Sequence, residues 1–383
     1  MQELAPTNIF PYFIGSGIFI LIAFVIHQLN PFYRTLTNHN EQQVLTLDGL
    51  RGFLALGVFF HHAIINHNYF LTSVWKTPDS TFYTLTGQVG VSLFFVITAF
   101  LFWSRVIKSE GSLNWKSFYR SRFQRILPMY FLTVLILILI ITYKELTNQT
   151  QIFNNFSQTL AITKQLLKFI FFSTPNIPVE NFYTVNAGVY WTLVWEWKFY
   201  LALPLLSVSL PSKKGKLLTI LLFALFCISS DEKYLYYFLV GILAAEFYRK
   251  RFSITKQCKI ILDLCSLLLF FVIFYFFDTA YGIKQALVSF FLFICLLYGD
   301  GLFGVLHTKP ARLLGEISYS IYLLHGLVIS FVISFLPNPL FYTKHYWPIT
   351  LSMGCLTIIL SSMSYQYVER YFYKKPKNIE SKL

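Results

Sequence analysis

The chain has 383 residues, of which 56% are hydrophobic, 19% are aromatic and only 13% are charged. Soluble globular domains have about 45–50% apolar and about 25% charged residues, so this composition excludes an ordinary soluble protein and indicates one embedded in a membrane. The formal net charge of +14 does not predict a nucleic-acid partner, because basic residues collect in the cytoplasmic loops of membrane proteins.

Eleven apolar segments predict an all-α polytopic membrane protein. Typical runs such as 132–143 and 260–277 approach, with their flanks, the roughly 20 apolar residues that cross the bilayer core as a helix, whereas several others are short and are expected to be tilted or extended by flanking aromatic residues. In chain order, the expected spans are 9–29, 47–67, 88–104, 126–143, 190–210, 217–230, 234–249, 259–277, 284–299, 315–336 and 347–368. A further apolar stretch, 160–173, contains Lys164 and Lys168 and is therefore expected to be interfacial or re-entrant.

The loops between these spans alternate in basic content, and this alternation supports the span count. Six Lys and Arg residues lie between 104 and 126, whereas the longer stretch 144–189 is poor in basic residues for its length. Because basic loops stay in the cytoplasm, the pattern predicts a cytoplasmic C-terminus and an N-terminus outside.

The five cysteines predict neither a metal site nor a disulfide framework. No two of them form a CxxC pair, and most lie within or beside apolar runs. Cysteines in this setting are small apolar core residues, so we expect no metal ion.

Several ionisable residues interrupt the predicted spans, and such residues are functional candidates because each costs several kcal/mol in hydrocarbon unless it is paired or hydrated. The candidates are Arg51, His61, His62, Glu196, Lys198 and His325. Arg51 and His62 are eleven residues apart, close to three helical turns, so they share one face about 16 Å apart along the axis. Their depths place His62, Glu196 and His325 in one layer of the membrane, where adjoining helices would form a buried acid/base cluster. The alternative is that these groups only hydrogen-bond neighbouring helices together, which is favoured for His61 and Lys198 and remains open for His325.

A second feature is the arginine pair Arg122 and Arg125 at the start of the span 126–143. Two guanidinium groups three residues apart suit a phosphate-bearing ligand, since each can bind phosphate oxygens bidentately. From composition alone, simple anchoring of the helix end by the positive-inside rule is the favoured alternative.

Motifs along most of the chain resemble those of one family. They are, in chain order, LDGLRGFLALGVFFHH (47–62), GVSLFFVITAFLFW (90–103), RSRFQRILPMY (120–130), YWTLVWEWKFYLALPLL (190–206), FLVGILAAE (238–246), LGEISYSIYLLH (314–325) and SYQYVER (364–370). Together they resemble the membrane-bound acyltransferase-3 family of O-acyltransferases. The chain departs from the family pattern at Thr98-Ala99, where Ser-Gly is usual, at Lys198, where a neutral amide is usual, and at Tyr371, where a proline is usual. Lys198 is next but one to Glu196 and is expected to change the charge of the pocket.

The resemblance implies a ten-helix acyltransferase-3 core with one extra N-terminal transmembrane helix. The expected domains are 1–40 for the extra helix and its linker, 41–373 for the acyltransferase domain, and 374–383 for a basic cytoplasmic tail. Many relatives carry a fused soluble esterase-like domain, and the expectation here is a stand-alone member.

The implied reaction moves an acyl group, most simply acetyl, from cytoplasmic acyl-CoA to a hydroxyl of a cell-surface glycan or lipid-linked sugar. Arg122 and Arg125 are then expected to hold the phosphates of CoA. Arg51 is expected in the catalytic and the cofactor-binding set, where it holds the pantetheine or diphosphate arm or, alternatively, anchors its helix through Asp48. His62 is the expected general base, because an imidazole titrates near working pH. Glu196 and His325 would orient His62 or the acceptor, and the expected location is a bacterial plasma membrane.

A membrane transporter or channel is the alternative function, because intramembrane His, Glu and Arg residues also mark ion pathways. Transporters commonly show paired internal repeats and helices broken by Gly or Pro at matching positions, and neither is visible here. The sequence leaves open the acceptor hydroxyl, the length of the acyl group, direct transfer against an acyl-histidine intermediate, and the oligomeric state.

Overall fold

The computed structural model describes residues 5–38, 45–148, 164, 182–208, 212–250 and 252–372, and all regular structure within them is helical. The helices are α1 (Phe10–Leu29), α2 (Pro31–Asn38), α3 (Leu45–Thr72), α4 (Thr81–Lys108), α5 (Trp115–Asn148), α7 (Phe182–Val185), α8 (Trp191–Ser207), α9 (Lys213–Ser229), α10 (Leu235–Tyr248), α11 (Lys256–Phe276), α12 (Ile283–Tyr298), the 3₁₀ helix η1 (Val305–His307), α13 (Lys309–Glu316), α14 (Ser318–Ile333), α15 (Pro339–Lys344), α16 (Tyr346–Ser364), the π-helix η2 (Tyr365–Glu369) and α17 (Arg370–Phe372). The prediction of an all-helical membrane protein is confirmed at this level.

Each of the eleven predicted spans overlies a helix, but fewer helices are long and apolar enough to cross a membrane. Among the described residues, five helices meet that standard, or six if the pair α13 and α14, bent by 68°, forms one broken span. Helices α8, α9, α10 and α12 have only 14 to 17 residues. The ten-helix core with one added helix therefore stays a prediction.

The expected boundaries differ most at α5. This helix begins at Trp115, well before the predicted start at 126, and continues through Pro128. Arg122 and Arg125 therefore lie inside a continuous helix instead of in the loop that precedes it. A proline costs a helix one backbone hydrogen bond, and α5 accepts this cost within a longer run of good helix formers.

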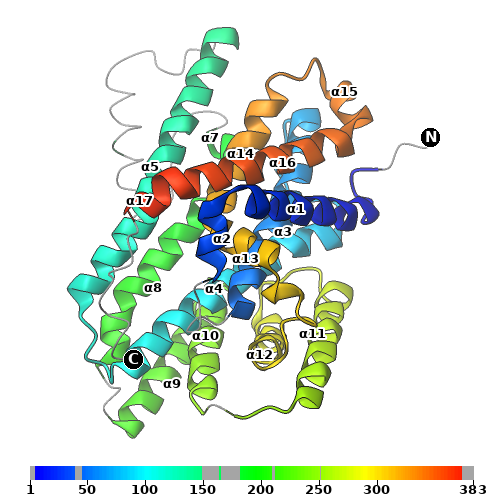
Figure 1. Ribbon diagram of the computed structural model, residues 1–383. Helices are drawn as coiled ribbons and strands as arrows, with labels where there is room; N and C mark the ends of the chain where they lie inside the picture. The colour runs from blue at the N-terminus through cyan, green and yellow to red at the C-terminus, as the bar shows by residue number, and fades with distance from the viewer. Residues whose placement is uncertain are drawn as a thin grey trace.

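Helices α3 and α4 cross at the centre of the molecule, and most of their side chains are buried (Figure 1). Glycines let α3 approach the α13 region closely. A Cβ atom added at Gly49 would collide with the carbonyl oxygen of Leu306, and one added at Gly315 would collide with the carbonyl oxygen of Asp48. At these two glycines the backbones of the two segments touch directly, and this close approach brings the site residues of α3 beside α14.

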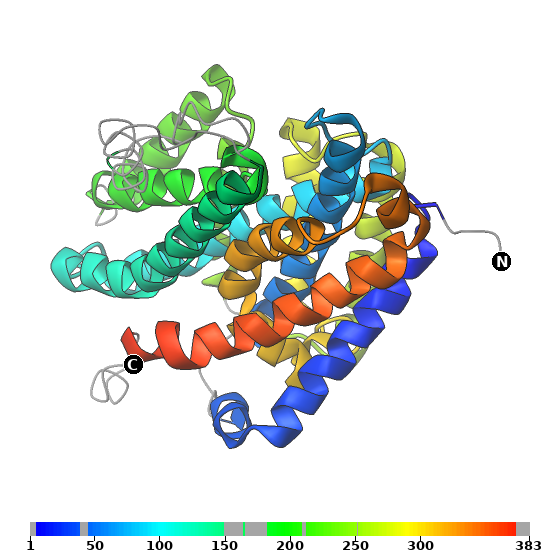
Figure 2. The ribbon, with the colours of Figure 1, turned by 90° about the horizontal axis from the view of Figure 1, so that it is seen from above.

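Helix α1 lies alongside α16 on one flank of the bundle (Figure 2). The segment after α1 is tied to the C-terminal end of α16: the Tyr33 hydroxyl donates to the Ser362 carbonyl at 2.6 Å, and Asn30 Nδ2 donates to Gln366 Oε1 at 2.7 Å. The N-terminal helices are therefore packed onto the bundle and onto the π-helix η2, which interrupts the last long helix.

Asp263 is a buried carboxylate in α11 that has a structural function. Its two oxygens accept hydrogen bonds from the backbone N–H groups of Asp300, Leu302 and Phe303 at 2.8–3.3 Å. Leu302 and Phe303 both have φ of 55°, a conformation that costs energy for residues with a Cβ. The carboxylate stabilises this strained turn and thereby fixes the connection from α12 to η1.

Three expectations fall outside the part of the chain that the structure describes. They concern the interfacial stretch 160–173, apart from Lys164, most of the loop 144–189, and the basic tail 374–383.

Candidate functional site

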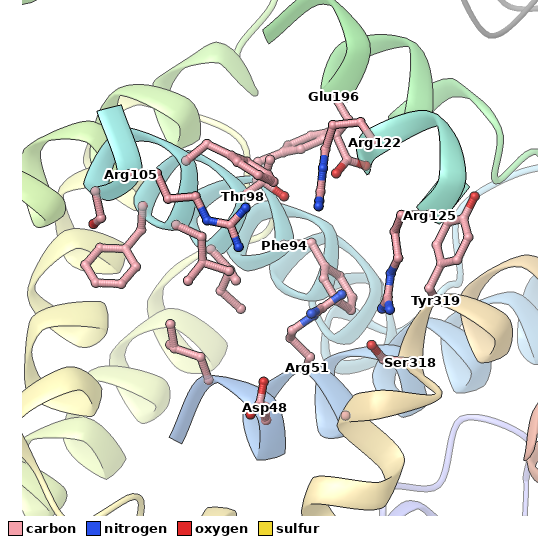
Figure 3. A pocket seen from close by; sticks show the side chains of 18 of the residues that line it. Asp48, Arg51, Phe94, Thr98, Arg105, Arg122, Arg125, Glu196, Ser318 and Tyr319 are labelled. Carbon is pink, nitrogen blue, oxygen red and sulfur yellow. The ribbon is translucent and has the colours of Figure 1, made fainter. Parts of the chain in front are cut away.

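A cavity of about 1070 Å³ lies between α3, α4, α5, α8 and the start of α14 (Figure 3). Its lining includes seven cationic side chains and four acidic ones. The cations are Arg51, Arg105, Lys108, Arg122, Arg125, Arg249 and Arg370, and the acids are Asp48, Glu110, Glu196 and Glu316. The cavity therefore has an excess of positive charge and suits an anionic ligand.

Three helices supply the arginines that point into this cavity. Figure 3 shows Arg51 from α3, Arg105 from α4, and Arg122 and Arg125 from α5 directed toward one space. The α5 arginines are three residues apart, so one face of that helix presents both. The three cofactor-binding candidates from the sequence thus lie together, although Arg51 is far from the α5 pair in the chain.

The Phe102 ring positions two of these cations. The Arg122 guanidinium lies 4.8 Å from the ring centroid and that of Arg105 lies 5.5 Å away, within cation–π range. Arg122 also donates from Nη2 to Ser121 Oγ at 2.9 Å. Its Nε is buried and makes no hydrogen bond within the described residues, so this N–H group can donate a hydrogen bond to a ligand.

Glu196 lines the cavity beside the arginines. The Tyr200 hydroxyl, one helical turn further along α8, donates a short hydrogen bond to Glu196 Oε1. Neither His62 nor His325 is among the described residues that line the cavity. The three candidates for the acid/base cluster therefore fall into two groups, a carboxylate among the arginines and a histidine pair behind the cavity wall.

The histidine pair is a direct contact between α3 and α14. His62 Nδ1 and His325 Nε2 are 2.9 Å apart, and the two rings stack with centroids 5.0 Å apart. His325 Nδ1 is 3.1 Å from the Ile321 carbonyl oxygen, which can only accept. Neutral His325 must then carry its proton on Nδ1 and accept at Nε2, so His62 donates from Nδ1. This assignment leaves an unprotonated Nε2 on His62, which is the form that a general base requires.

Tyr322 connects the histidine pair to the cavity. It lines the cavity, and its ring centroid is 6.1 Å from that of His325. Its hydroxyl donates to the Val189 carbonyl at 3.1 Å and lies 2.9 Å from Thr192 Oγ1, another lining residue. His325 is fully buried, whereas His62 keeps part of its surface exposed.

The remaining intramembrane candidates lie elsewhere. His61 Nδ1 bonds the Tyr83 carbonyl at 2.8 Å, and its ring fills the space above Gly87, so it joins α3 to α4. Lys198 is exposed, with Nζ 3.8 Å from the centroid of the Trp195 ring, and it does not line the cavity. The expectation that Lys198 changes the charge of the pocket is therefore wrong, because its side chain leaves α8 on the face opposite to the cavity.

Several lining residues are not singled out by the sequence. Tyr322 precedes His325 by three residues and Tyr200 follows Glu196 by four, so helical spacing was a signal that pointed to both. Tyr365, whose hydroxyl donates to Glu316 Oε2 at 2.7 Å, is brought to the cavity only by tertiary packing. Among the described residues, no group of three or more His, Cys, Asp and Glu side chains could hold a metal ion.

Comparisons with known proteins identify the family of the chain. Residues 44–365 match the acyltransferase domain that defines the acyltransferase-3 family. A Staphylococcus aureus (strain COL) protein with the provisional name O-acetyltransferase is 25% identical over 369 residues, covering 86% of this chain and 57% of that protein. A Bacillus subtilis (strain 168) protein with the provisional name peptidoglycan O-acetyltransferase is 25% identical over 372 residues, covering 85% and 54%. The O-acetyltransferase OatA of Staphylococcus aureus (strain NCTC 8325) is 24% identical over 370 residues, covering 86% and 57%.

The chain spans little more than half the length of these curated relatives. No solved structure matches it. The matched residues begin just before α3 and end in the π-helix η2, so they include α3, α4, α5, α8 and α14, which build the cavity and the histidine pair. The chain therefore belongs to the acyltransferase-3 family.

Proposed function

We propose that this protein is an integral membrane O-acyltransferase that moves an acetyl group from acetyl-CoA to a hydroxyl of a glycan or lipid-linked saccharide. The observation that carries the proposal is one arrangement: a cationic cavity that ends at Tyr322, with the His62–His325 pair directly behind it. The relatives named as O-acetyltransferases support the same reaction class.

The cavity suits the phosphates of acetyl-CoA as donor. Its volume of about 1070 Å³ lies just above the ~300–1,000 Å³ found for small-molecule sites, which fits a long ligand. Arg51, Arg122 and Arg125 would bind phosphate oxygens, with guanidinium geometry that matches phosphate bidentately. Glu196, held by Tyr200, would orient one of these guanidinium groups or the acceptor.

His62 Nε2 is the proposed base. It would take the proton of the acceptor hydroxyl while that oxygen attacks the thioester carbonyl carbon. The resulting imidazolium would return the proton to the sulfur of CoA as the carbon–sulfur bond breaks. His325 would hold His62 in the required tautomer throughout, which makes His325 a positioning residue in the sense of the third member of a triad. An acyl-histidine route uses the same lone pair on His62 and stays open.

We propose a bacterial plasma membrane as the location and a polysaccharide of the cell envelope as the acceptor. The relative named as a peptidoglycan O-acetyltransferase supports an acceptor of this class. The proposed orientation has the C-terminus in the cytoplasm, so that the basic loops face the side on which acetyl-CoA is made. The first helix, α1, lies outside the matched residues and is proposed as an addition to the family core.

The test compares His62→Ala with His61→Asn in cells that express each variant at wild-type level. Mass spectrometry of the envelope glycans should show an alkali-labile acetyl mass that His62→Ala loses, with activity falling about 10²–10⁴-fold. His61→Asn is the matched control, because His61 is the residue next to His62 on the same helix. The amide of asparagine can keep the hydrogen bond to the Tyr83 carbonyl. If His62→Ala retained acetylation, His62 would not be the catalytic base. If wild type showed no acetylation, the alternative function as a transporter would be favoured.

A further inference from the structure

A second cleft, of about 370 Å³, lies at the starts of α8 and α10. Four aromatic residues line it, together with two acids and one lysine. They are Tyr183, Trp191, Tyr234 and Tyr281, with Asp231, Glu232 and Lys233. Tyr234, the residue just before α10, lines the cleft, whereas Arg249, the residue just after α10, lines the cavity. These two residues are about 22 Å apart by helical rise, comparable with most of a bilayer core.

A single layer of side chains separates the cleft from the cavity. Trp191 and Thr192 are consecutive residues at the start of α8, and the first lines the cleft while the second lines the cavity. Phe95, which lines the cavity, packs against Trp191 with ring centroids 6.0 Å apart and against Tyr234 at 6.3 Å. Thr192 contacts the Tyr322 hydroxyl, one helical turn from His325. A ligand in the cleft would therefore lie next to the inner end of the cavity.

The chemistry of the cleft fits a sugar ring. None of its four aromatic residues is fully buried, so their rings keep exposed area at the cleft. A pyranose presents an apolar face of C–H bonds that packs on an aromatic ring, and an edge of hydroxyl groups that donate hydrogen bonds to carboxylates. Glu232 is already oriented, because the Tyr234 hydroxyl donates to its Oε2 in a short hydrogen bond.

The charges of the cleft restrict which sugar it accepts. The cleft has two carboxylates and one ammonium group, so its net charge is negative. It would therefore repel a sugar acid but not a neutral ring. We propose that this cleft is an acceptor subsite that binds a neutral pyranose ring of the glycan on the side of the membrane opposite to the donor. The proposal rests on the proposed function and adds to it the place and the charge class of the acceptor.

The experiment measures saccharide binding directly, on the purified full-length chain in lipid nanodiscs. Saturation-transfer NMR is recorded with chitotetraose and maltotetraose as neutral probes and with tetragalacturonate as the acidic probe of equal length. We expect binding of at least one neutral probe and weaker binding of the acidic one. Trp191→Leu and Tyr281→Leu should each weaken neutral binding roughly two- to tenfold. The matched control is Tyr275→Leu, because this tyrosine of α11 is 70% exposed and lines neither the cleft nor the cavity.

A charge variant keeps the test decisive if an aromatic variant fails to fold. Asp231 is exposed in the loop before α10, so Asp231→Lys should fold and should shift preference toward tetragalacturonate. The proposal is overturned if neither neutral probe binds, if Tyr275→Leu weakens binding as much as the cleft variants do, or if Asp231→Lys leaves the preference unchanged. A quaternary ammonium ligand such as choline that binds in place of both saccharides would also overturn it, since aromatic cages suit such cations.

Failure here is distinguishable from failure of the proposed function. Release of free thiol from acetyl-CoA, measured in the presence of envelope glycan as acceptor, reports on acyl transfer and does not depend on the NMR signal of saccharide binding. If wild type binds a neutral probe through the cleft but releases no thiol, the acyltransferase proposal fails, and the cleft remains a saccharide-binding site without a role as acceptor subsite. If thiol release depends on His62 while the cleft variants bind saccharide as wild type does, only the subsite fails.

Discussion

Arg122 combines two properties that a phosphate-binding side chain needs. The Phe102 ring holds its guanidinium in place, and its buried Nε has no hydrogen-bond partner among the described residues. A buried donor without a partner costs about 1–3 kcal/mol, so a ligand that accepts from it gains part of this energy back. Arg122 is therefore where the proposed donor contact should be strongest.

Replacing Arg122 by lysine should weaken acetyl-CoA binding, because lysine keeps the charge and loses the bidentate geometry. We expect the KM for acetyl-CoA to rise roughly tenfold, equivalent to about 1.4 kcal/mol. The measurement is thiol release against acetyl-CoA concentration. Lys198→Gln is the control and should match wild type, since Lys198 lies outside the cavity. Equal KM values for Arg122→Lys and wild type would contradict a bidentate contact.

At the scale of residues, the sequence predicts more about which side chains matter than about what they touch. The cost of charge in hydrocarbon singles out Arg51, Glu196 and the two histidines, and the structure brings all four to the cavity or directly behind it. The same rule applies to Asp263, which lies inside a predicted span but serves a strained turn. A carboxylate that binds backbone N–H groups and one that binds a ligand look alike in sequence, because the partners come from distant parts of the chain.

Among the elements, the close approach of α3 to η1 and α13 depends on glycines, which have no side chain to hold the backbones apart. Gly49→Ala should destabilise the protein by about 1–3 kcal/mol, because its methyl group would meet the Leu306 carbonyl oxygen, and backbone has little freedom to move aside. The measurement is the thermal unfolding midpoint in detergent. Gly17→Ala is the matched control from α1: no atom lies within 4 Å of its added methyl, so it should leave stability unchanged or raise it by up to about 1 kcal/mol. Equal midpoints for the two variants would show that α3 does not need this contact.

Helix positions were predictable from apolar runs, and their ends were not. A run of apolar residues marks the part of α5 that faces other helices or lipid, but the helix continues for eleven residues before 126 through polar and basic side chains. The five-residue π-helix η2 has no sequence signal of its own, and it ends at the buried Glu369, which accepts a hydrogen bond from Ser320 of α14. Such features are set by packing across the bundle.

For the molecule as a whole, one native cysteine tests the predicted orientation in the membrane. Cys258 is exposed at the start of α11, within a basic loop that is predicted to be cytoplasmic. In intact cells it should resist a membrane-impermeant maleimide. Asp231→Cys, made in a Cys258→Ser background, should react because the 231–233 loop lies at the other end of α10.

Permeabilised cells provide the control, since both cysteines should then be labelled to the same extent. Labelling of Cys258 but not of the cysteine at position 231 in intact cells would show that the orientation is the opposite of the predicted one. The cationic cavity would then open away from cytoplasmic acetyl-CoA, and the donor assignment would fail with it.

The tie between α2 and the end of α16 has a consequence for biogenesis. Phe32, Thr35 and Leu36 of α2 form part of the wall of the cationic cavity, and the Tyr33 hydroxyl bonds to Ser362, 329 residues later in the chain. Because a chain is synthesised from its N-terminus, α2 leaves the ribosome long before the residue that it binds. The wall of the cavity is therefore completed only after Ser362 has been translated, and any chain that stops before this residue lacks the contact that holds α2 in place.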